Sequence, residues 1–257
     1  MAKLKFEEDE RLGIITLVDT PMNLIDFEFM EELEKLVKDI QTHELRSLLF
    51  KVDKGNFSAG ANVVVFKDLG EEAARELLKE FVGIITKIES LPFPTMAAVN
   101  GMCIGGGFEL ALACDYIWAS ENSQFAAAEI LIGIVPLGGG AQRLAQRAGI
   151  ARAKEIILNG RFQKPEKLEK WNIVNRVLLE SELNEKAIRF MKAQAKGPTL
   201  AFNTIKLLLK EYHNAGLDQS DDLLIEIVPN LFETEDIEIG IESFKKQGPG
   251  KAIFKGK

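Results

Sequence analysis

Three consecutive glycines at positions 105–107 separate a strand-like segment from a helix-like segment, and this junction constrains the fold more than any other part of the chain. The apolar residues 95–99 predict a buried strand, and residues 108–114 predict a short apolar helix. Glycine permits backbone conformations closed to other residues and lets a ligand come close to the backbone. Because the first N–H groups of the helix would face whatever lies over the glycines, the junction favours a site that holds negative charge on oxygen.

Strand-like and helix-like segments alternate over most of the chain, which predicts an α/β fold. The 257 residues, of which 46% are hydrophobic, suffice to bury a full core. After residue 181 the pattern becomes helical and charged, so we place a soft boundary near Leu200. The apolar patterns predict strands at 12–18, 47–52, 95–99, 116–119 and 174–178, and helices at 26–40, 71–88, 108–114, 141–147 and 151–158.

Charge and cysteine content exclude several classes of protein. The net charge of −7 argues against a surface for nucleic acid or anionic lipid, and we expect no nucleic-acid or membrane partner. Cys103 and Cys114 form no CxxC pair and no metal-type cluster, so we expect reduced thiols, no bound metal and a cytoplasmic location. Residues 1–10 are too acidic for a signal or transit peptide, and no apolar run is long enough to span a membrane.

Two loops share the order of a strand, then small residues, then a helix start: residues 57–61 and glycines 105–107. If the loops converge, their N–H groups would form an oxyanion hole with two donors. Removing one such donor typically lowers a reaction rate about 10²–10³-fold. The alternative is that the glycines serve only tight turns and close packing of helix on strand, and the loops taken alone favour that alternative.

Glu109 and Glu129 are the candidate acid and base, because each stands alone among apolar neighbours. The Glu109 side chain is expected to lean toward the N-terminus of its helix, where the glycines lie. Two carboxylates in one desolvated pocket would take different protonation states, so one could donate a proton while the other accepts one. The alternative is that each glutamate caps a helix or pairs with an arginine such as Arg143, and spacing alone leaves both interpretations open.

Three blocks of sequence together resemble the enoyl-CoA hydratase/isomerase (crotonase) superfamily. Residues 97–116 are similar to the family signature over its whole length, and residues 57–62 (FSAGAN) resemble its FxAGAD-type loop. Residues 133–144 resemble its GxxP and GGxQRL block, and the three blocks occur in the family's order.

The resemblance implies a fold and an assembly. The fold would be a spiral of repeated ββα units over residues 1–199 that carries the site for a CoA thioester. Residues 200–257 would form a helical C-terminal region that drives assembly into trimers or, by pairing of trimers, hexamers. The substrate would be an acyl-CoA, and no cofactor beyond its coenzyme A moiety is implied.

The resemblance also assigns site residues. The N–H groups of Ala61 and Gly106 would hold the thioester oxygen, Glu109 would deprotonate the water that attacks the β-carbon, and Glu129 would protonate the α-carbon. The coenzyme A moiety would be bound by Met22, Leu24, Ala59, Gly60, Ala61, Asn62 and Gly105.

Two positions and one segment depart from the family pattern. Ala128 replaces the usual proline, Asn62 replaces the usual aspartate and is still able to cap a helix, and residues 20–26 differ from the common RPxxxNAL entry. The last difference leaves acyl specificity open.

The retained glutamate pair favours reversible syn hydration of a 2-enoyl-CoA to a 3-hydroxyacyl-CoA. Isomerisation, decarboxylation or hydration of a dienoyl-CoA through the same CoA enolate are alternatives, because isomerases of this family work with one carboxylate at position 129. A non-catalytic RNA-binding member is a further alternative, which the acidic charge and the two glutamates disfavour.

Overall fold

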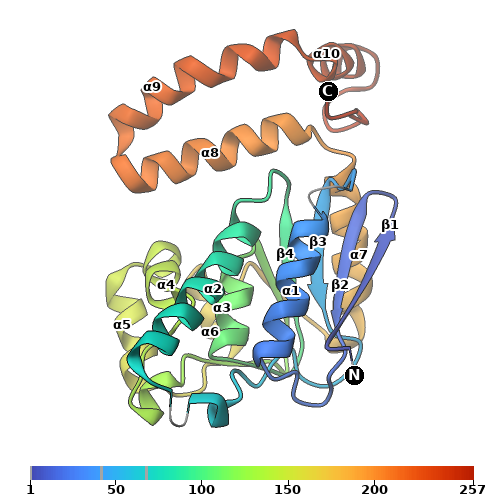
Figure 1. Ribbon diagram of the computed structural model, residues 1–257. Helices are drawn as coiled ribbons and strands as arrows, with labels where there is room; N and C mark the ends of the chain where they lie inside the picture. The colour runs from blue at the N-terminus through green and yellow to red at the C-terminus, as the bar shows by residue number, and fades with distance from the viewer. Residues whose placement is uncertain (1, 41–42, 67–68) are drawn as a thin grey trace.

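A twisted sheet lies at the centre of the computed structural model, which describes residues 2–40, 43–66 and 69–257 (Figure 1). Within these residues the sheet has six strands in the order β1-β2-β3-β4-β6-β8. β1 pairs antiparallel with β2, and all later neighbours pair in parallel. The strands are β1 (Leu4–Asp9), β2 (Leu12–Leu17), β3 (Ser47–Lys51), β4 (Thr95–Val99), β6 (Tyr116–Ser120) and β8 (Arg176–Leu178).

The chain winds as a spiral in which a strand of the large sheet is followed by a short extended segment in a second layer and then by a helix. One such turn runs from β4 through β5 (Met102–Ile104) into α3 (Gly106–Leu112). The next runs from β6 through β7 (Gln124–Ala126), which pairs in parallel with β5. The expected α/β spiral of ββα units is therefore confirmed.

In the earlier turns the second layer is reduced to single bridges. Ile25 pairs with Ala61, and Ser58 pairs with Cys103, each in parallel. The second layer thereby connects each turn of the spiral to a later one. These bridges bring segments distant in sequence, such as those around Ile25 and Ala61, side by side.

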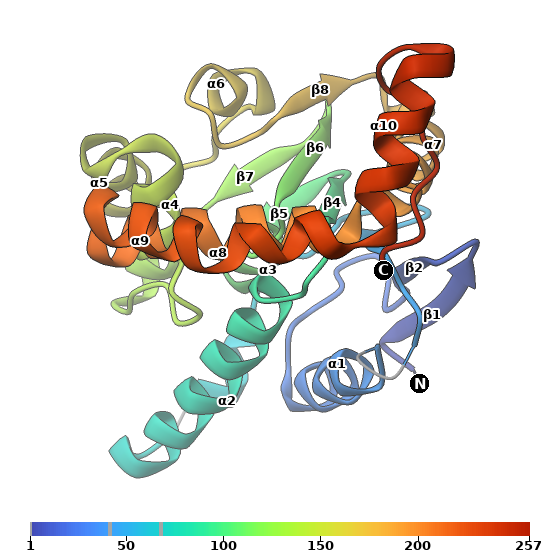
Figure 2. The ribbon, with the colours of Figure 1, turned by 90° about the horizontal axis from the view of Figure 1, so that it is seen from above.

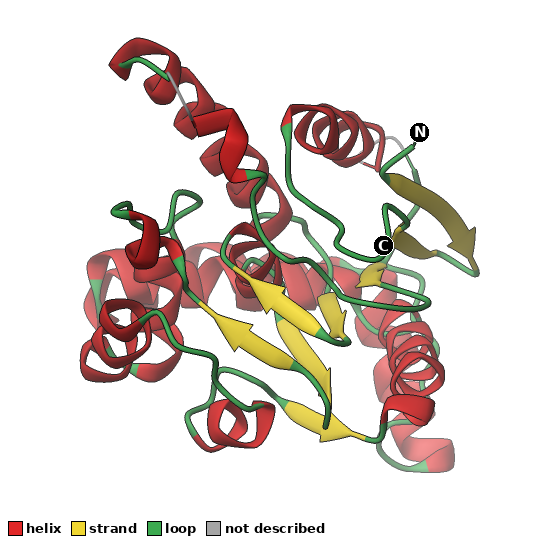
Figure 3. Ribbon diagram, turned by 90° about the horizontal axis from the view of Figure 1, so that it is seen from below, coloured by secondary structure: helices red, strands yellow, loops and turns green. Residues whose placement is uncertain are grey.

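Both faces of the large sheet are covered, which explains the continuous apolar runs of its inner strands. Every residue of β2, β3 and β4 is buried. One face packs against α7 (Glu180–Ala195), and the other faces the main core beneath α1 (Phe27–Ile40) and α2 (Glu71–Glu89) (Figure 3). The contact with α7 joins Leu12, Leu49 and Met96 of the sheet to Leu183, Ala187 and Met191 of the helix.

The helices of the spiral begin where the sequence supplies caps or glycines. Asp26 precedes α1 and its Oδ1 accepts the Phe29 N–H at 3.0 Å, as expected for a helix N-cap. Asn62 caps the short helix η1 (Val63–Phe66), since its Oδ1 accepts the Val64 N–H at 3.3 Å, and the expected capping is confirmed. The other elements are η2 (Glu129–Ile132), α4 (Gly140–Ala148), α5 (Ile150–Asn159) and α6 (Pro165–Lys170).

The C-terminal helices form an arm over one end of the sheet (Figures 1 and 2). They are α8 (Thr199–Ala215), α9 (Leu217–Ile227), η3 (Val228–Glu233) and α10 (Glu235–Gln247). α8 begins next to Leu200, the expected boundary, and the division into two domains at that point remains our proposal.

Buried Arg46 ties this arm to the sheet. Its Nε donates to Thr199 Oγ1 at 2.7 Å, its Nη1 to Phe254 O at 2.6 Å, and its Nη2 to Gly197 O. One guanidinium therefore fixes both the start of α8 and the C-terminal tail against the residue that precedes β3.

The short elements β1, β5, β7 and α6 and the short helices η1, η2 and η3 were not predicted from the sequence. Within the acidic N-terminal segment, residues 4–9 form β1, whose residues are alternately buried and exposed along part of its length because β1 lies at the edge of the sheet. β5 and β7 have three residues each, too few for a periodic pattern to be recognised.

Candidate active site

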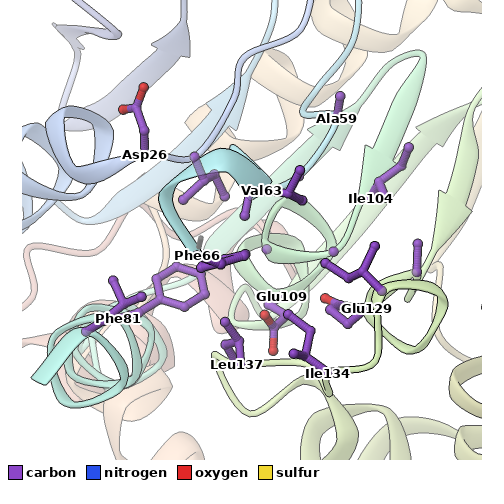
Figure 4. A pocket seen from close by; sticks show the side chains of 18 of the residues that line it. Asp26, Ala59, Val63, Phe66, Phe81, Ile104, Glu109, Glu129, Ile134 and Leu137 are labelled. Carbon is purple, nitrogen blue, oxygen red and sulfur yellow. The ribbon is translucent and has the colours of Figure 1, made fainter. Parts of the chain in front are cut away.

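A pocket of about 280 Å³ lies between the start of α1, η1, α2, the loop before α3, and η2 (Figure 4). Ala61, Gly106, Glu109 and Glu129 all line it, so the structure brings the four predicted catalytic residues together. The rest of its wall is largely apolar and includes Ile25, Met30, Val63, Phe66, Leu77, Phe81, Ile104, Leu131, Ile132, Ile134 and Leu137.

Each glycine of the 105–107 run is required by a different neighbour. Gly105 has φ +52°, and a Cβ there would lie 3.1 Å from Glu129 Oε1. A Cβ at Gly106 would lie 3.1 Å from Ile25 Cδ1, and one at Gly107 only 2.4 Å from Ser58 Cβ. The loop is therefore a point of close approach between three turns of the spiral, so the tight-packing interpretation of the glycines holds beside their role in the pocket.

Two backbone N–H groups of the pocket are available to a ligand. Ile25 donates to Gly60 O at 2.9 Å and accepts from Asn62 N–H at 3.0 Å, so the intervening Ala61 N–H points away from Ile25. Gly106 is the first residue of α3, and its N–H has no acceptor within the helix. Neither N–H donates to another residue of the described part of the chain.

Glu109 is buried to 3% exposure on the first turn of α3, where its carboxylate reaches the loop before α4. Its Oε1 accepts the N–H groups of Gly138 and Gly140, both at 2.7 Å. Burial raises the pKa of Glu109, and the two hydrogen bonds act against that rise. The helix-cap alternative for Glu109 is thus partly confirmed, because Gly140 is the first residue of α4.

Arg143 is not the ion-pair partner of either glutamate. Its Nη2 pairs with Glu89 Oε2 at 2.6 Å, and its Nη1 donates to Gly138 O at 3.0 Å. Its positive charge still lowers the pKa of Glu109 through space. The arginine therefore braces the glycine loop that holds Glu109.

Glu129 is the first residue of η2. In Figure 4, Glu109 lies between Phe81 on one side and Glu129 on the other. Its Oε2 is buried and has no hydrogen-bond partner among the described residues. Burial first, and the charge of Glu109 in addition, raise the pKa of Glu129 to about 7. The two carboxyl groups therefore differ in surroundings: Glu109 accepts two N–H groups of a neighbouring loop, whereas Oε2 of Glu129 has no partner among the described residues.

Comparison with known proteins identifies the family of this chain. The family described as enoyl-CoA hydratase/isomerase matches residues 7–256. The chain belongs to the enoyl-CoA hydratase/isomerase family.

Relatives of this family confirm both the sequence resemblance and the fold. A probable enoyl-CoA hydratase from Rhizobium meliloti is 31% identical over 259 residues, which cover 98% of this chain and 97% of that protein. A carnitinyl-CoA dehydratase from Salmonella typhi is 35% identical over 182 residues, covering 69% of this chain and 68% of that protein. The crystal structure of an enoyl-CoA hydratase from Bacillus anthracis superposes with a TM-score of 0.92 at 26% identity and covers all of both chains.

The residues expected to bind coenzyme A in this family member lie in two groups. Ala59, Gly60, Ala61 and Gly105 line the pocket. Met22, Leu24 and Asn62 are not among its lining residues and form the adjoining backbone: Met22 O accepts the Ala59 N–H at 2.8 Å, and the exposed Met22 side chain faces solvent.

Two features of the site were missed by sequence reasoning. Glycines 138–140 entered the sequence analysis only as part of the block that resembles the family, yet two of their N–H groups bind Glu109. A Cβ at Gly138 would lie 2.7 Å from Phe81 Cε1, so the ring of Phe81 packs directly on this loop. The glycine run at 138–140 was the sequence signal for the hydrogen bonds to Glu109. The apolar face of the helix at 71–89 was the signal for the packing of Phe81.

The described residues contain no cluster of three or more His, Cys, Asp or Glu side chains able to hold a metal ion. No helix within residues 2–40, 43–66 and 69–257 is both long and apolar enough to cross a membrane.

Proposed function

We propose that this chain catalyses the reversible syn addition of water to a 2-enoyl-CoA thioester, which gives a 3-hydroxyacyl-CoA. One observation carries the proposal: two carboxyl groups with raised pKa values and two free backbone N–H groups face the same apolar pocket. Hydration needs all four, because water must lose a proton, the α-carbon must gain one, and the thioester oxygen becomes negatively charged between the two events.

The unequal surroundings of the glutamates support a division of roles. Glu109 accepts two N–H hydrogen bonds that favour its ionised form, so it is the base. Glu129 has a bare Oε2 and a pKa of about 7, so it carries the proton that the α-carbon receives.

The proposed reaction then balances in two steps. Glu109 removes a proton from water as the oxygen forms a bond to the β-carbon, and the electrons of the double bond move to the thioester oxygen. The N–H groups of Ala61 and Gly106 hold that oxygen as an enolate. The enolate then takes the proton of Glu129 at the α-carbon and restores the thioester carbonyl. Exchange of one proton with solvent returns both glutamates to their starting states.

Loss of the conjugated-thioester absorbance of crotonyl-CoA tests the proposal. Glu109→Gln and Glu129→Gln should each lower the hydration rate about 10²–10⁴-fold, the range for removal of a positioned acid or base. The exposed glutamate of an ordinary helical ion pair, Glu76, provides the control, and Glu76→Gln should keep wild-type turnover. Near wild-type turnover in either pocket variant would rule out the assignment.

Isomerisation of an enoyl-CoA is the second candidate. It needs one group that removes and returns a proton, and the bare Oε2 and raised pKa of Glu129 suit that task. Mass analysis of products from a panel of acyl-CoA substrates separates the reactions: a water adduct indicates hydration, an unchanged mass indicates isomerisation, and loss of CO₂ indicates decarboxylation.

The coenzyme A moiety is proposed to lie along the backbone of residues 59–62 and 22–24, beside the two N–H donors. The helical arm from Thr199 onward is proposed to assemble three copies of the chain, as in the family. The arm exposes large apolar side chains that an isolated chain leaves in water, including Ile205, Leu209, Ile225, Phe232 and Phe244. Sedimentation should give a trimer or hexamer, and a monomer at micromolar concentration would contradict this part of the proposal.

A further inference from the structure

Ser58 is a fully buried residue that joins the two loops of the proposed oxyanion hole. It lies three residues before Ala61 in the chain. Its N–H donates to Met102 O at 2.9 Å, and its carbonyl oxygen accepts the Ile104 N–H at 2.9 Å. Because Gly106 follows Ile104 by two residues, the backbone of Ser58 holds the strand that leads to the second donor.

The hydroxyl group of Ser58 holds the first donor's loop. Its Oγ accepts the Gly60 N–H at 3.1 Å and donates to Asn23 O at 2.7 Å. Gly60 immediately precedes Ala61, and Gly60 O in turn accepts the Ile25 N–H at 2.9 Å. The side chain therefore fixes the peptide next to the Ala61 donor and links it to the segment before α1.

The third contact of Ser58 is with the first turn of α3. A Cβ at Gly107 would lie 2.4 Å from Ser58 Cβ and 2.8 Å from Ser58 Oγ, closer than real Cβ atoms approach. The helix start that presents the Gly106 N–H therefore rests directly on the Ser58 side chain. Ser58 therefore contacts the loops of both donors in three ways: through backbone hydrogen bonds, through hydrogen bonds of its hydroxyl group, and through packing against Gly107.

We propose that Ser58 is a positioning residue that sets the separation and direction of the Ala61 and Gly106 N–H groups. Ser58 does not line the pocket, so it acts through these two residues and not on the substrate. The inference rests on the proposed function, because the placement of the donors matters only if a thioester oxygen lies between them. Such donors work by being placed before charge develops, so misplacement lowers kcat more than it weakens substrate binding.

Ser58→Ala removes the acceptor of the Gly60 N–H and the donor to Asn23 O. We expect kcat for hydration to fall about tenfold with little change in KM, a smaller loss than the about 10²–10³-fold cost of deleting a donor outright. The matched control is Ser47→Ala. Ser47 is also fully buried, and its Oγ donates to a backbone carbonyl, Met191 O at 3.0 Å, but it lies on the α7 side of the sheet.

The carbonyl stretching band of bound butyryl-CoA, labelled with ¹³C at the thioester carbon, is the decisive measurement. This saturated thioester is not hydrated, and an oxyanion hole polarises its carbonyl and lowers the band's frequency. Wild-type protein and Ser47→Ala should lower the frequency equally, and Ser58→Ala should lower it less. An equal lowering in Ser58→Ala and wild type would overturn the role of Ser58, because a merely structural serine leaves the bound carbonyl unaffected.

Ser58→Cys keeps a side chain of similar shape whose thiol is a weaker donor and acceptor. Its frequency shift should fall between those of Ser58→Ala and wild type. If Ser58→Ala does not fold, Ser58→Cys decides the question, and a full wild-type shift in that variant would contradict the inference. The absence of any shift in wild-type protein would refute the oxyanion hole itself, and so the proposed function together with this inference.

Discussion

Burial raises the pKa values of the two pocket glutamates, and hydrogen bonding lowers them. Both carboxyl groups are removed from water, which raises both pKa values. Glu109 recovers part of the lost solvation from two backbone N–H donors, whereas Glu129 Oε2 recovers none. Two side chains of the same chemical type, both with raised pKa values, are therefore solvated differently in one pocket.

The raised pKa of Glu129 predicts a pH-dependent loss of stability. Its folded-state pKa of about 7 exceeds its ordinary value of 4.5, so the folded state binds more protons between these values. The contribution of Glu129 to the free energy of unfolding is fully present below pH 4.5 and is lost as the pH rises through 7. Glu129→Gln should therefore raise Tm relative to wild type at pH 8, and the difference should vanish near pH 4.5. Calorimetry across this range checks the trend, and a constant difference in Tm would contradict it.

The same pKa predicts an alkaline limit to the proposed hydration. If Glu129 delivers the proton to the α-carbon, kcat/KM should fall as the pH rises through about 7, because the acid is then ionised in the free enzyme. The profile is measured with crotonyl-CoA in overlapping buffers. A rate that stays level from pH 6 to pH 9 would show that another group supplies the proton.

At the scale of the element, long apolar segments were predictable and short paired ones were not. The buried runs of β2, β3 and β4 and the amphipathic face of α2 are strong local patterns, and the structure confirms each. β5 and β7 exist because each pairs with the other across the second layer. Such pairing depends on partners about twenty residues apart and leaves little trace in three residues.

The same contrast applies to the pocket. The isolation of Glu109 and Glu129 among apolar residues marked them as candidates, and the resemblance to the family led us to expect them beside Ala61 and Gly106. The hydrogen bonds of Glu109 to Gly138 and Gly140 were not expected. They depend on how α3 and the start of α4 pack, which no local pattern around position 109 encodes.

Two glycines in helices should respond oppositely to alanine. Gly107→Ala in α3 would place a Cβ 2.4 Å from Ser58 Cβ and should destabilise the protein by about 1–3 kcal/mol through overpacking. Gly83 in α2 has open space at its Cβ position, so Gly83→Ala should stabilise by about 0.5–1 kcal/mol through helix propensity. Urea unfolding of both variants measures the difference, and a Gly107→Ala variant as stable as wild type would show that the α3 start is not tightly packed.

At the scale of the whole molecule, the C-terminal arm is joined to the sheet through few polar contacts. Arg46 binds Thr199 of the arm, Phe254 of its tail and Gly197 just before α8, and Lys206 of α8 pairs with Asp115 at 2.9 Å. Because these links are local, the arm can be loosened without disturbing the pocket directly.

Arg46→Ala should therefore destabilise the arm selectively. Loss of the guanidinium leaves partly buried carbonyl groups of Gly197 and Phe254 without this donor, and the cost of about 1–3 kcal/mol for a fully buried group is the upper bound for each. Limited proteolysis should cut the variant faster near the start of α8. Arg75→Ala, which removes an exposed i,i+4 ion pair with Glu71, is the matched control and should leave the cleavage rate unchanged.

The pocket draws on successive turns of the spiral: Ala61 precedes α2, Gly106 and Glu109 open α3, and Glu129 follows β7. A bound acyl-CoA would therefore contact three turns of the spiral at once and hold them together, instead of contacting one loop alone. Any opening that slides one turn past the next would have to release the ligand first. At a hundredfold excess over Kd, such a ligand adds about 2.7 kcal/mol to the free energy of that opening. Amide hydrogen exchange should slow together in β5 and β7 on binding, far beyond the atoms that the ligand touches.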